Sequence, residues 1–129
     1  GETLLITKQP DGHSAVYRVP RPLEARRTVT VERVADLDVG AADPSGNLVT
    51  DAAISADGRR VNVRTYTSAL DYDLADGASL AGIWGQAARV VPLSDGPKGE
   101  GITYRADGSA LMTTGESSPA SLYATSRQC

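Results

Sequence analysis

The sequence predicts an all-β protein built from repeated four-stranded antiparallel sheets. Short strand signals fill the chain, an outline containing Asp-Gly recurs along it, and helix signals are nearly absent. The strand signals are rich in β-branched and aromatic residues and are bounded by turn formers. The expected strands are residues 4–7, 14–19, 28–34, 49–55, 61–66, 69–74, 88–93, 101–104, 110–114 and 121–125.

Only residues 78–87, ASLAGIWGQA, favour a helix. Gly82 and Gly85 weaken that preference, because glycine loses more backbone entropy in a helix than other residues do. A loop containing one helical turn is an equally good interpretation. Trp84, on this segment, is expected to cover the outer edge of a sheet.

The recurring outline has a period near 50 residues. Asp57-Gly58 and Asp107-Gly108 each precede two expected strands, and Gly1 aligns with the same glycine column. Asp-Gly supplies the positive φ that a tight connection between antiparallel strands needs. A period of this length with several short strands per unit is the signature of propeller blades, which must stack because a lone sheet cannot bury both faces. The aligned apolar and aromatic columns are Leu4, Val61 and Leu111, and Tyr17, Tyr72 and Tyr123.

SADG at residues 55–58 is similar to the S-x-D-G turn of TolB-type and WD-type propeller repeats, which links the innermost strand of a blade to the second. RADG at residues 105–108 departs from that form in its first position. The resemblance covers nearly the whole chain. It implies a partial blade at 1–34 without its innermost strand, a second blade at 35–93, and a third, incomplete blade at 94–129.

Closed propellers need four blades or more. Three explanations for the shorter count stay open: a fragment of a longer protein, an oligomer that closes a ring, or a fold that is not a propeller. We favour the fragment, because the chain starts in the middle of a blade. The expected partners are therefore other blades, from the same parent chain or from a partner chain.

Composition narrows the classes of partner. The chain carries a net charge of −3, and its 13 Lys and Arg residues are scattered, so a nucleic-acid surface is not expected. No apolar run approaches the roughly 20 residues that cross a bilayer, and no signal-peptide pattern opens the chain. Cys129 is the single cysteine, so no internal disulfide forms. No pattern fixes the compartment; an extracellular or periplasmic one is the expectation.

Candidate site residues come from blade geometry. The innermost strand starts, and the second strand ends, at the same end of a blade, because the two strands are antiparallel. These places surround the mouth of the central channel. Arg64 and Tyr66 there either grip an anionic ligand or pack between blades. The expected ligand-binding residues are Asp51, Arg64, Tyr66, Glu100 and Glu116, with Asp36, Asp38 and Asp43 from the solvated connection that we expect at 36–47.

The acidic residues at this mouth would suit calcium, because hard cations take several oxygen ligands. We therefore expect Asp51, Glu100 and Glu116 as metal ligands. The alternative for Glu100 is a hydrogen bond to a neighbouring blade's backbone, or simple solvation. Thr50 stands where the second blade would need the counterpart of Glu100.

Residues 99–116, GEGITYRADGSALMTTGE, are similar to a strand pair of phytase-like and calcium-dependent lactonase propellers. The resemblance implies an axial metal held near Glu100. No catalytic residue can be assigned: His13 lies in a turn, and no G-x-S-x-G elbow is present. Two functions follow, a module that binds a ligand or a protein and, as the alternative, part of a metal-assisted hydrolase.

Overall fold

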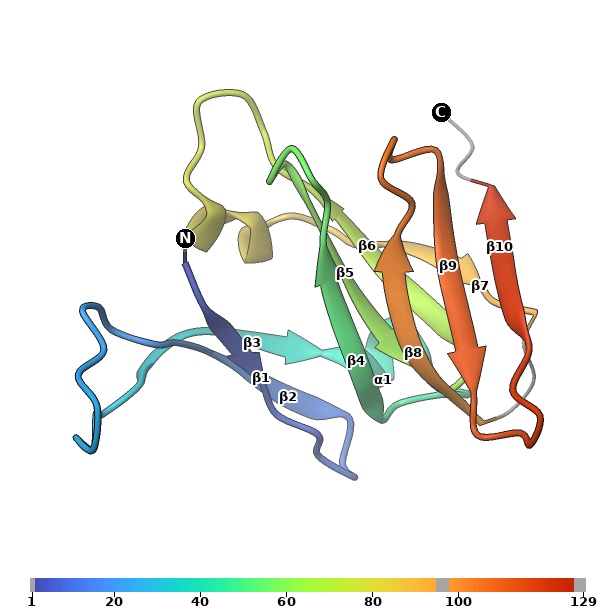
Figure 1. The fold of residues 1–129 in the computed structure, drawn as a ribbon, viewed down its shortest axis with the longest axis horizontal. Helices are drawn as coiled ribbons and strands as arrows, with labels where there is room; N and C mark the ends of the chain where they lie inside the picture. The colour runs from blue at the N-terminus through green and yellow to red at the C-terminus, as the bar shows by residue number, and fades with distance from the viewer. Residues whose placement is uncertain (1, 95–97, 127–129) are drawn as a thin grey trace.

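The computed structural model describes residues 2–94 and 98–126, so the expectation for Cys129 lies outside the described residues. The fold is three antiparallel sheets that stand beside one another, with consecutive strands paired in each (Figure 1). The prediction of an all-β, antiparallel fold is confirmed. The first sheet contains β1 (Leu4–Ile6), β2 (His13–Arg18) and β3 (Glu32–Asp38). The second sheet contains β4 (Val49–Ile54), β5 (Arg60–Thr65), β6 (Ser68–Asp73) and β7 (Arg89–Pro92). The third sheet contains β8 (Gly99–Tyr104), β9 (Ala110–Gly115) and β10 (Leu122–Ser126).

The third strand differs from its prediction. We expected it at residues 28–34, but residues 28–31 are outside any strand and β3 continues to Asp38. The reason is pairing: β2 ends at Arg18, opposite Glu32, so no strand of this sheet remains for residues 28–31 to pair with. The expected boundary after residue 34 therefore falls inside β3. The connection before it is exposed throughout residues 20–30.

Within residues 2–94 and 98–126, helical structure is limited to two short pieces. α1 (Val39–Ala42) follows β3, and the 3₁₀ helix η1 (Leu80–Gly85) joins β6 to β7. The interpretation of residues 78–87 as a loop with a helical turn is therefore the right one. Within the described residues, no helix has both the length and the apolar character to span a membrane.

Trp84 is buried, and the expectation that it covers an outer edge is wrong. Its ring meets Tyr72 of β6 edge-on, with 5.3 Å between ring centroids and 67° between ring planes. η1 contacts β3 as well as β6, so the indole lies between the first two sheets. Apolar side chains of both sheets offer it more buried surface there than an outer edge would.

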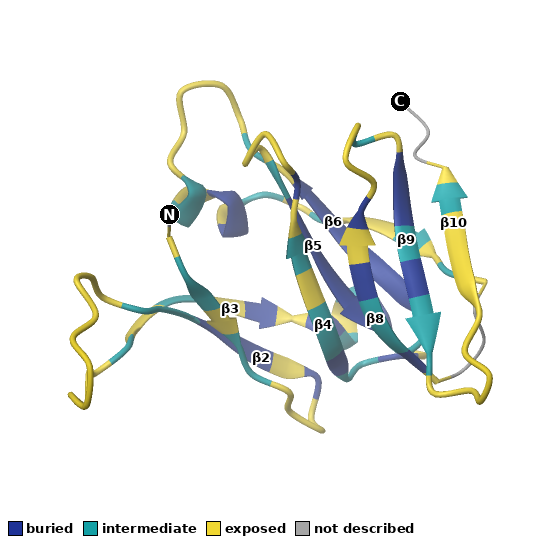
Figure 2. Ribbon diagram, viewed as in Figure 1, coloured by how far each residue is buried: buried dark blue, intermediate teal, exposed yellow. Residues whose placement is uncertain are grey.

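The core lies between neighbouring sheets. One cluster joins the first and second sheets, and a smaller one, which contains Ala69, Ile102 and Leu111, joins the second and third. The middle sheet is thus buried on both faces along β5 and β6, whereas β10 is largely exposed (Figure 2). Each large apolar side chain fully buried in these layers contributes about 1.5–3 kcal/mol.

The second and third sheets repeat each other in detail. β4 and β8 both carry a register shift near their first residues, between Val49 and Asp51 and between Gly99 and Gly101. Gly58 and Gly108 have φ of 70° and 71°, so the expected Asp-Gly turns form. The sequence repeat therefore corresponds to a structural repeat.

Candidate functional site

Lys8 and Tyr66 meet at one end of the sheets. Lys8 lies in the connection after β1, and Tyr66 lies in the turn after β5. Lys8 Nζ donates a hydrogen bond to the Tyr66 hydroxyl at 3.2 Å and is 4.9 Å from the centroid of its ring. The ring therefore attracts the ammonium through both its hydroxyl and its π face.

The charges of Glu100 and Glu116 act on the same ammonium. The hydrogen bond with Tyr66 raises the pKa of Lys8 most; partial loss of solvation opposes it, and the charges of Tyr66, Glu100 and Glu116 raise it further. Glu100 is the second residue of β8, and Glu116 directly follows β9. Side chains from all three sheets thus gather at one end; we call Lys8, Tyr66, Glu100 and Glu116 the mouth cluster.

Arg64 is separated from this cluster. Its side chain is fully buried, and Nη1 donates to the Gly101 carbonyl at 2.9 Å. Gly99 makes room for the guanidinium, because a Cβ on Gly99 would overlap it. Of the two roles that the sequence left open, the position of Arg64 supports packing between blades: it ties β5 of the second sheet to β8 of the third.

Asp51 also joins the second sheet to the third. Oδ2 accepts the Ile102 N–H at 2.8 Å, and Oδ1 accepts the N–H of its own neighbour Ala52 at 2.8 Å. Both carboxylate oxygens therefore hold backbone groups at the edge where β4 meets β8. The interaction that the sequence suggested for Glu100, with a neighbouring blade's backbone, is made by Asp51 instead.

The expected connection 36–47 divides into two environments. Asp36 and Asp38 belong to β3, so they are not loop residues; Asp36 pairs with Arg33, and Asp38 Oδ1 accepts the Ala41 N–H at 3.0 Å and caps α1. The expectation that both lie in a solvated connection is wrong, because β3 pairs with β2 along its whole length.

Asp43 is enclosed. Its carboxylate accepts hydrogen bonds from the hydroxyls of Ser45 at 2.8 Å, Thr65 at 2.7 Å and Thr67 at 3.0 Å, and from that of Ser68. Burial alone would raise the pKa of Asp43, but these four bonds lower it to about 2. The ionised carboxylate thus fastens the β5–β6 turn to the connection that follows α1.

The described part of the chain shows no metal centre. Across residues 2–94 and 98–126, no group of three or more His, Cys, Asp or Glu side chains is placed to hold a metal ion. Asp51 holds backbone N–H groups, whereas the charges of Glu100 and Glu116 act on the ammonium of Lys8. Metal ligation by these three residues stays a prediction.

Sequence reasoning missed Lys8, although the repeat contains the signal. Lys8 directly follows Thr7, which shares an alignment column with Arg64 and Thr114 at the end of the second strand of a blade. Applying the same rule to the first unit would have placed Lys8 at the mouth. The hydroxyl cage of Asp43 has no such signal, because its members come from two separate segments.

Comparison with known proteins identifies the fold. No protein-family model matches the sequence, and no curated protein matches it. Among solved structures, the chain is similar to the β-propeller domain of Cps50 (Swd1) from Myceliophteria thermophila, with a TM-score of 0.57 and 15% identity. The match covers 97% of this chain and 37% of that chain, and at this identity it shows the fold alone. The chain therefore folds as part of a β-propeller, with two three-stranded sheets flanking one four-stranded blade.

Proposed function

We propose that this chain is part of a binding module, a propeller segment that recognises a protein through its mouth cluster. Further blades, from the same parent chain or from a partner chain, complete the propeller. The observation that carries the proposal is the contact between Lys8 and Tyr66 at the end of the sheets where β8 starts with Glu100 and β9 is followed by Glu116. Polar residues held at strand ends by a rigid sheet scaffold are a common arrangement for recognition.

The chemistry of the cluster favours a positively charged group on the partner. An aromatic ring beside two carboxylates attracts ammonium and guanidinium groups, and Lys8 takes that position here. A Lys or Arg side chain of a partner would compete with Lys8 for Tyr66 and the two glutamates. Arg64, the cation that the sequence offered for an anionic ligand, is buried between sheets.

The test is a titration of the full chain with blocked tripeptides Gly-Arg-Gly and Gly-Glu-Gly, followed by NMR of Tyr66 and of the Glu100 and Glu116 amides. The arginine peptide should shift these signals, the glutamate peptide should not, and the double variant Glu100→Gln/Glu116→Gln should weaken the response at least fivefold. Glu24→Gln, on the exposed connection before β3, is the matched control. Equal responses to both peptides would overturn the proposal.

The alternative, a metal-assisted hydrolase similar to phytase-like or lactonase propellers, requires Asp51, Glu100 and Glu116 to share a calcium ion. Calcium that binds the folded state alone raises the melting temperature once its concentration exceeds the dissociation constant. We expect no rise at millimolar calcium, because both oxygens of Asp51 already hold N–H groups and no group of three acidic side chains is placed to hold a metal among the described residues. A rise that Glu100→Gln abolishes would favour the hydrolase instead.

A further inference from the structure

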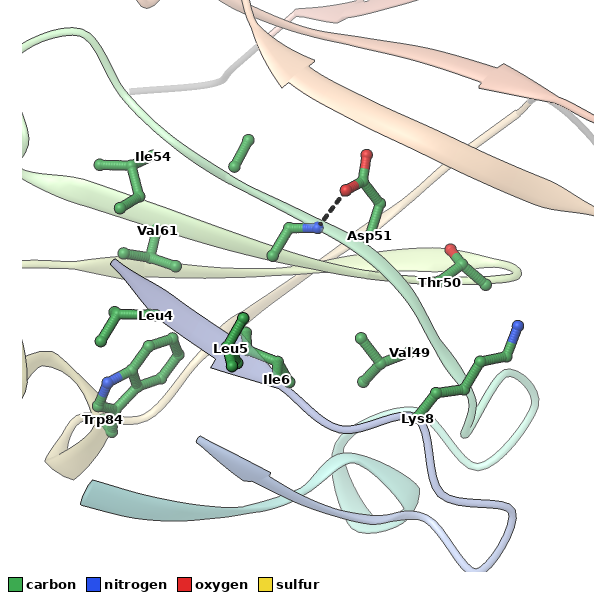
Figure 3. Close-up of a pocket in the computed structure, with 12 residues that line it drawn as sticks. Leu4, Leu5, Ile6, Lys8, Val49, Thr50, Asp51, Ile54, Val61 and Trp84 are labelled. Carbon is green, nitrogen blue, oxygen red and sulfur yellow. Dashed lines mark hydrogen bonds between the residues drawn. The ribbon is translucent and has the colours of Figure 1, made fainter. Parts of the chain in front are cut away.

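An apolar groove of about 400 Å³ runs between β1 and β4 (Figure 3). Leu5 of β1 and Ile54 of β4 both line it and remain 49% and 42% exposed, so the groove presents apolar side chains to solvent. Trp84 lies at one end of the groove and Lys8 near the other. The remaining lining residues are Leu4, Ile6, Val49, Thr50, Asp51, Ala52, Ala53 and Val61.

β1 is an edge strand next to this groove. It pairs with β2 on one side, and no described strand pairs with its other edge. The N–H and C=O groups of such an edge are available to another extended segment. The groove therefore combines open backbone hydrogen bonds with exposed apolar side chains, the two requirements for strand addition.

The next pair of sheets shows what fills the equivalent position. There β8, the innermost strand of the third sheet, packs against β4, the innermost strand of the second. Ala53 of β4 packs beside Ile102 and Tyr104, and the Asp51 carboxylate accepts the Ile102 N–H. On the opposite side of β4, the corresponding neighbour would be a strand beside β1, where the groove lies.

We propose that the groove between β1 and β4 seats an extended polypeptide strand, which pairs antiparallel with β1 and gives the first sheet four strands. β4 and β8 define its character: a strand of about six residues, with small and apolar side chains against β4, that ends in an Asp-Gly turn. An acidic residue at its start, as Glu100 is in β8, would face Lys8. This inference deepens the proposed module by naming the surface on which another segment completes it.

The experiment supplies such a strand. Gly1 aligns with Gly58, so the sequence VTDAAISAD of residues 49–57 is fused directly before Gly1, which reproduces the repeat in register. We expect the melting temperature to rise by about 5 °C or more. Emission of Trp84, the only tryptophan, should shift to shorter wavelength. Thr3 and Thr7 bond to β2, so the N–H of Ile6 points to the open edge, and its amide exchange should slow at least tenfold.

Two controls make the outcome specific. One extra glycine in the middle of the added segment, directly after the copy of Ala52, moves the side chains before it to the opposite face, so it should remove the gains. Leu5→Asp in the fused chain should remove them too, whereas Leu122→Asp, at an apolar residue of β10 that is 70% exposed, should not. Equal gains with and without the extra glycine would overturn the proposal.

A second copy of the chain is the competing occupant. A dimer of the unfused chain that Leu5→Asp dissociates would assign the groove to that copy and overturn the inference. The proposal that the mouth cluster binds a partner is tested separately, by the NMR response of Tyr66 to the arginine peptide. A chain that binds the arginine peptide but gains nothing from the fused strand would lose only the groove assignment.

Discussion

The second and third blades share one sequence outline but secure it with different side chains. In the second blade, Ser55 is buried, donates to Asp57 Oδ1 at 2.5 Å and accepts the Arg60 N–H at 3.0 Å. The third blade has Arg105 in that position, and there the Ser109 hydroxyl donates to Asp107 Oδ1 at 2.6 Å. The aspartate and glycine of the turn are thus constant, while the hydroxyl comes from either side of them.

The pKa values of the two aspartates agree with this comparison. The hydroxyl of Ser55 lowers the pKa of Asp57 most, and that of Ser109 lowers the pKa of Asp107 most. Backbone N–H groups two residues later add to both effects. The departure of RADG from S-x-D-G is therefore compensated within four residues.

The blades differ more at the end of the second strand. Arg64 of β5 is fully buried, whereas Thr114, its counterpart in β9, is half-buried. Thr65 supports the hydroxyl cage of Asp43, whereas Gly115 stands in its place in the third blade. The second blade has neighbouring sheets on both faces, and its extra polar contacts reach the connection before it and the sheet after it.

Replacing Arg64 should have the largest effect on this comparison. Arg64→Ala should reduce the free energy of unfolding by about 3 kcal/mol, because it removes a charged hydrogen bond to Gly101 and leaves a cavity between the sheets. Urea denaturation measures the loss. Arg59→Ala, at an exposed ion pair with Asp76, should cost less than about 0.5 kcal/mol. Equal losses would contradict the assigned role of Arg64.

Replacing Asp43 should have the second largest effect on stability, and this effect should depend on pH. Its pKa is about 2 in the fold and 3.8 in the unfolded chain, so its stabilisation is complete above pH 4 and is lost as pH falls towards 2. This difference corresponds to about 2 kcal/mol. Asp43→Asn should lower stability at pH 7 and flatten the dependence between pH 4 and 2, as thermal melting would show. Asp36→Asn, on exposed β3, should leave that dependence unchanged.

The turns should show the smallest effects. Ser55→Ala should cost about 1 kcal/mol, because a buried hydroxyl with two partners is removed, and Ser109→Ala should cost less, because Ser109 is exposed. Arg105→Ser should then restore the loss in the Ser109→Ala chain by supplying the hydroxyl from the other side. Chemical denaturation of the single and double variants measures each step. Failure of Arg105→Ser to restore stability would refute the equivalence of the two turns.

Much of the fold could be predicted because it is encoded locally. Asp57-Gly58 and Asp107-Gly108 specify turns through the backbone freedom of glycine, and the period between them predicts stacked sheets. Residues 28–31 were mispredicted from the alternation of apolar and polar residues. Such alternation indicates a strand with one solvent-exposed face, but it does not show whether a partner strand lies beside it. Pairing is a property of the whole sheet.

The candidate site was harder to predict for the same reason. Placement at a strand end did not reveal whether a side chain turns outward, as Tyr66 does towards Lys8, or inward, as Arg64 does. That choice depends on Gly99, which leaves space for the guanidinium from a different blade. No spacing within one repeat encodes a contact of this kind.

The carboxylate of Asp51 gives the stack of sheets a direction. It reaches from β4 forward to the Ile102 N–H of the next sheet, so the contacting surfaces of the two sheets are unlike. A heterologous contact is not satisfied by two-fold pairing; repeated head to tail, it gives a ring when the accumulated rotation closes and an open helix when it does not. Sheets stacked through this contact therefore have a fixed order, with β4 of one sheet reaching β8 of the next.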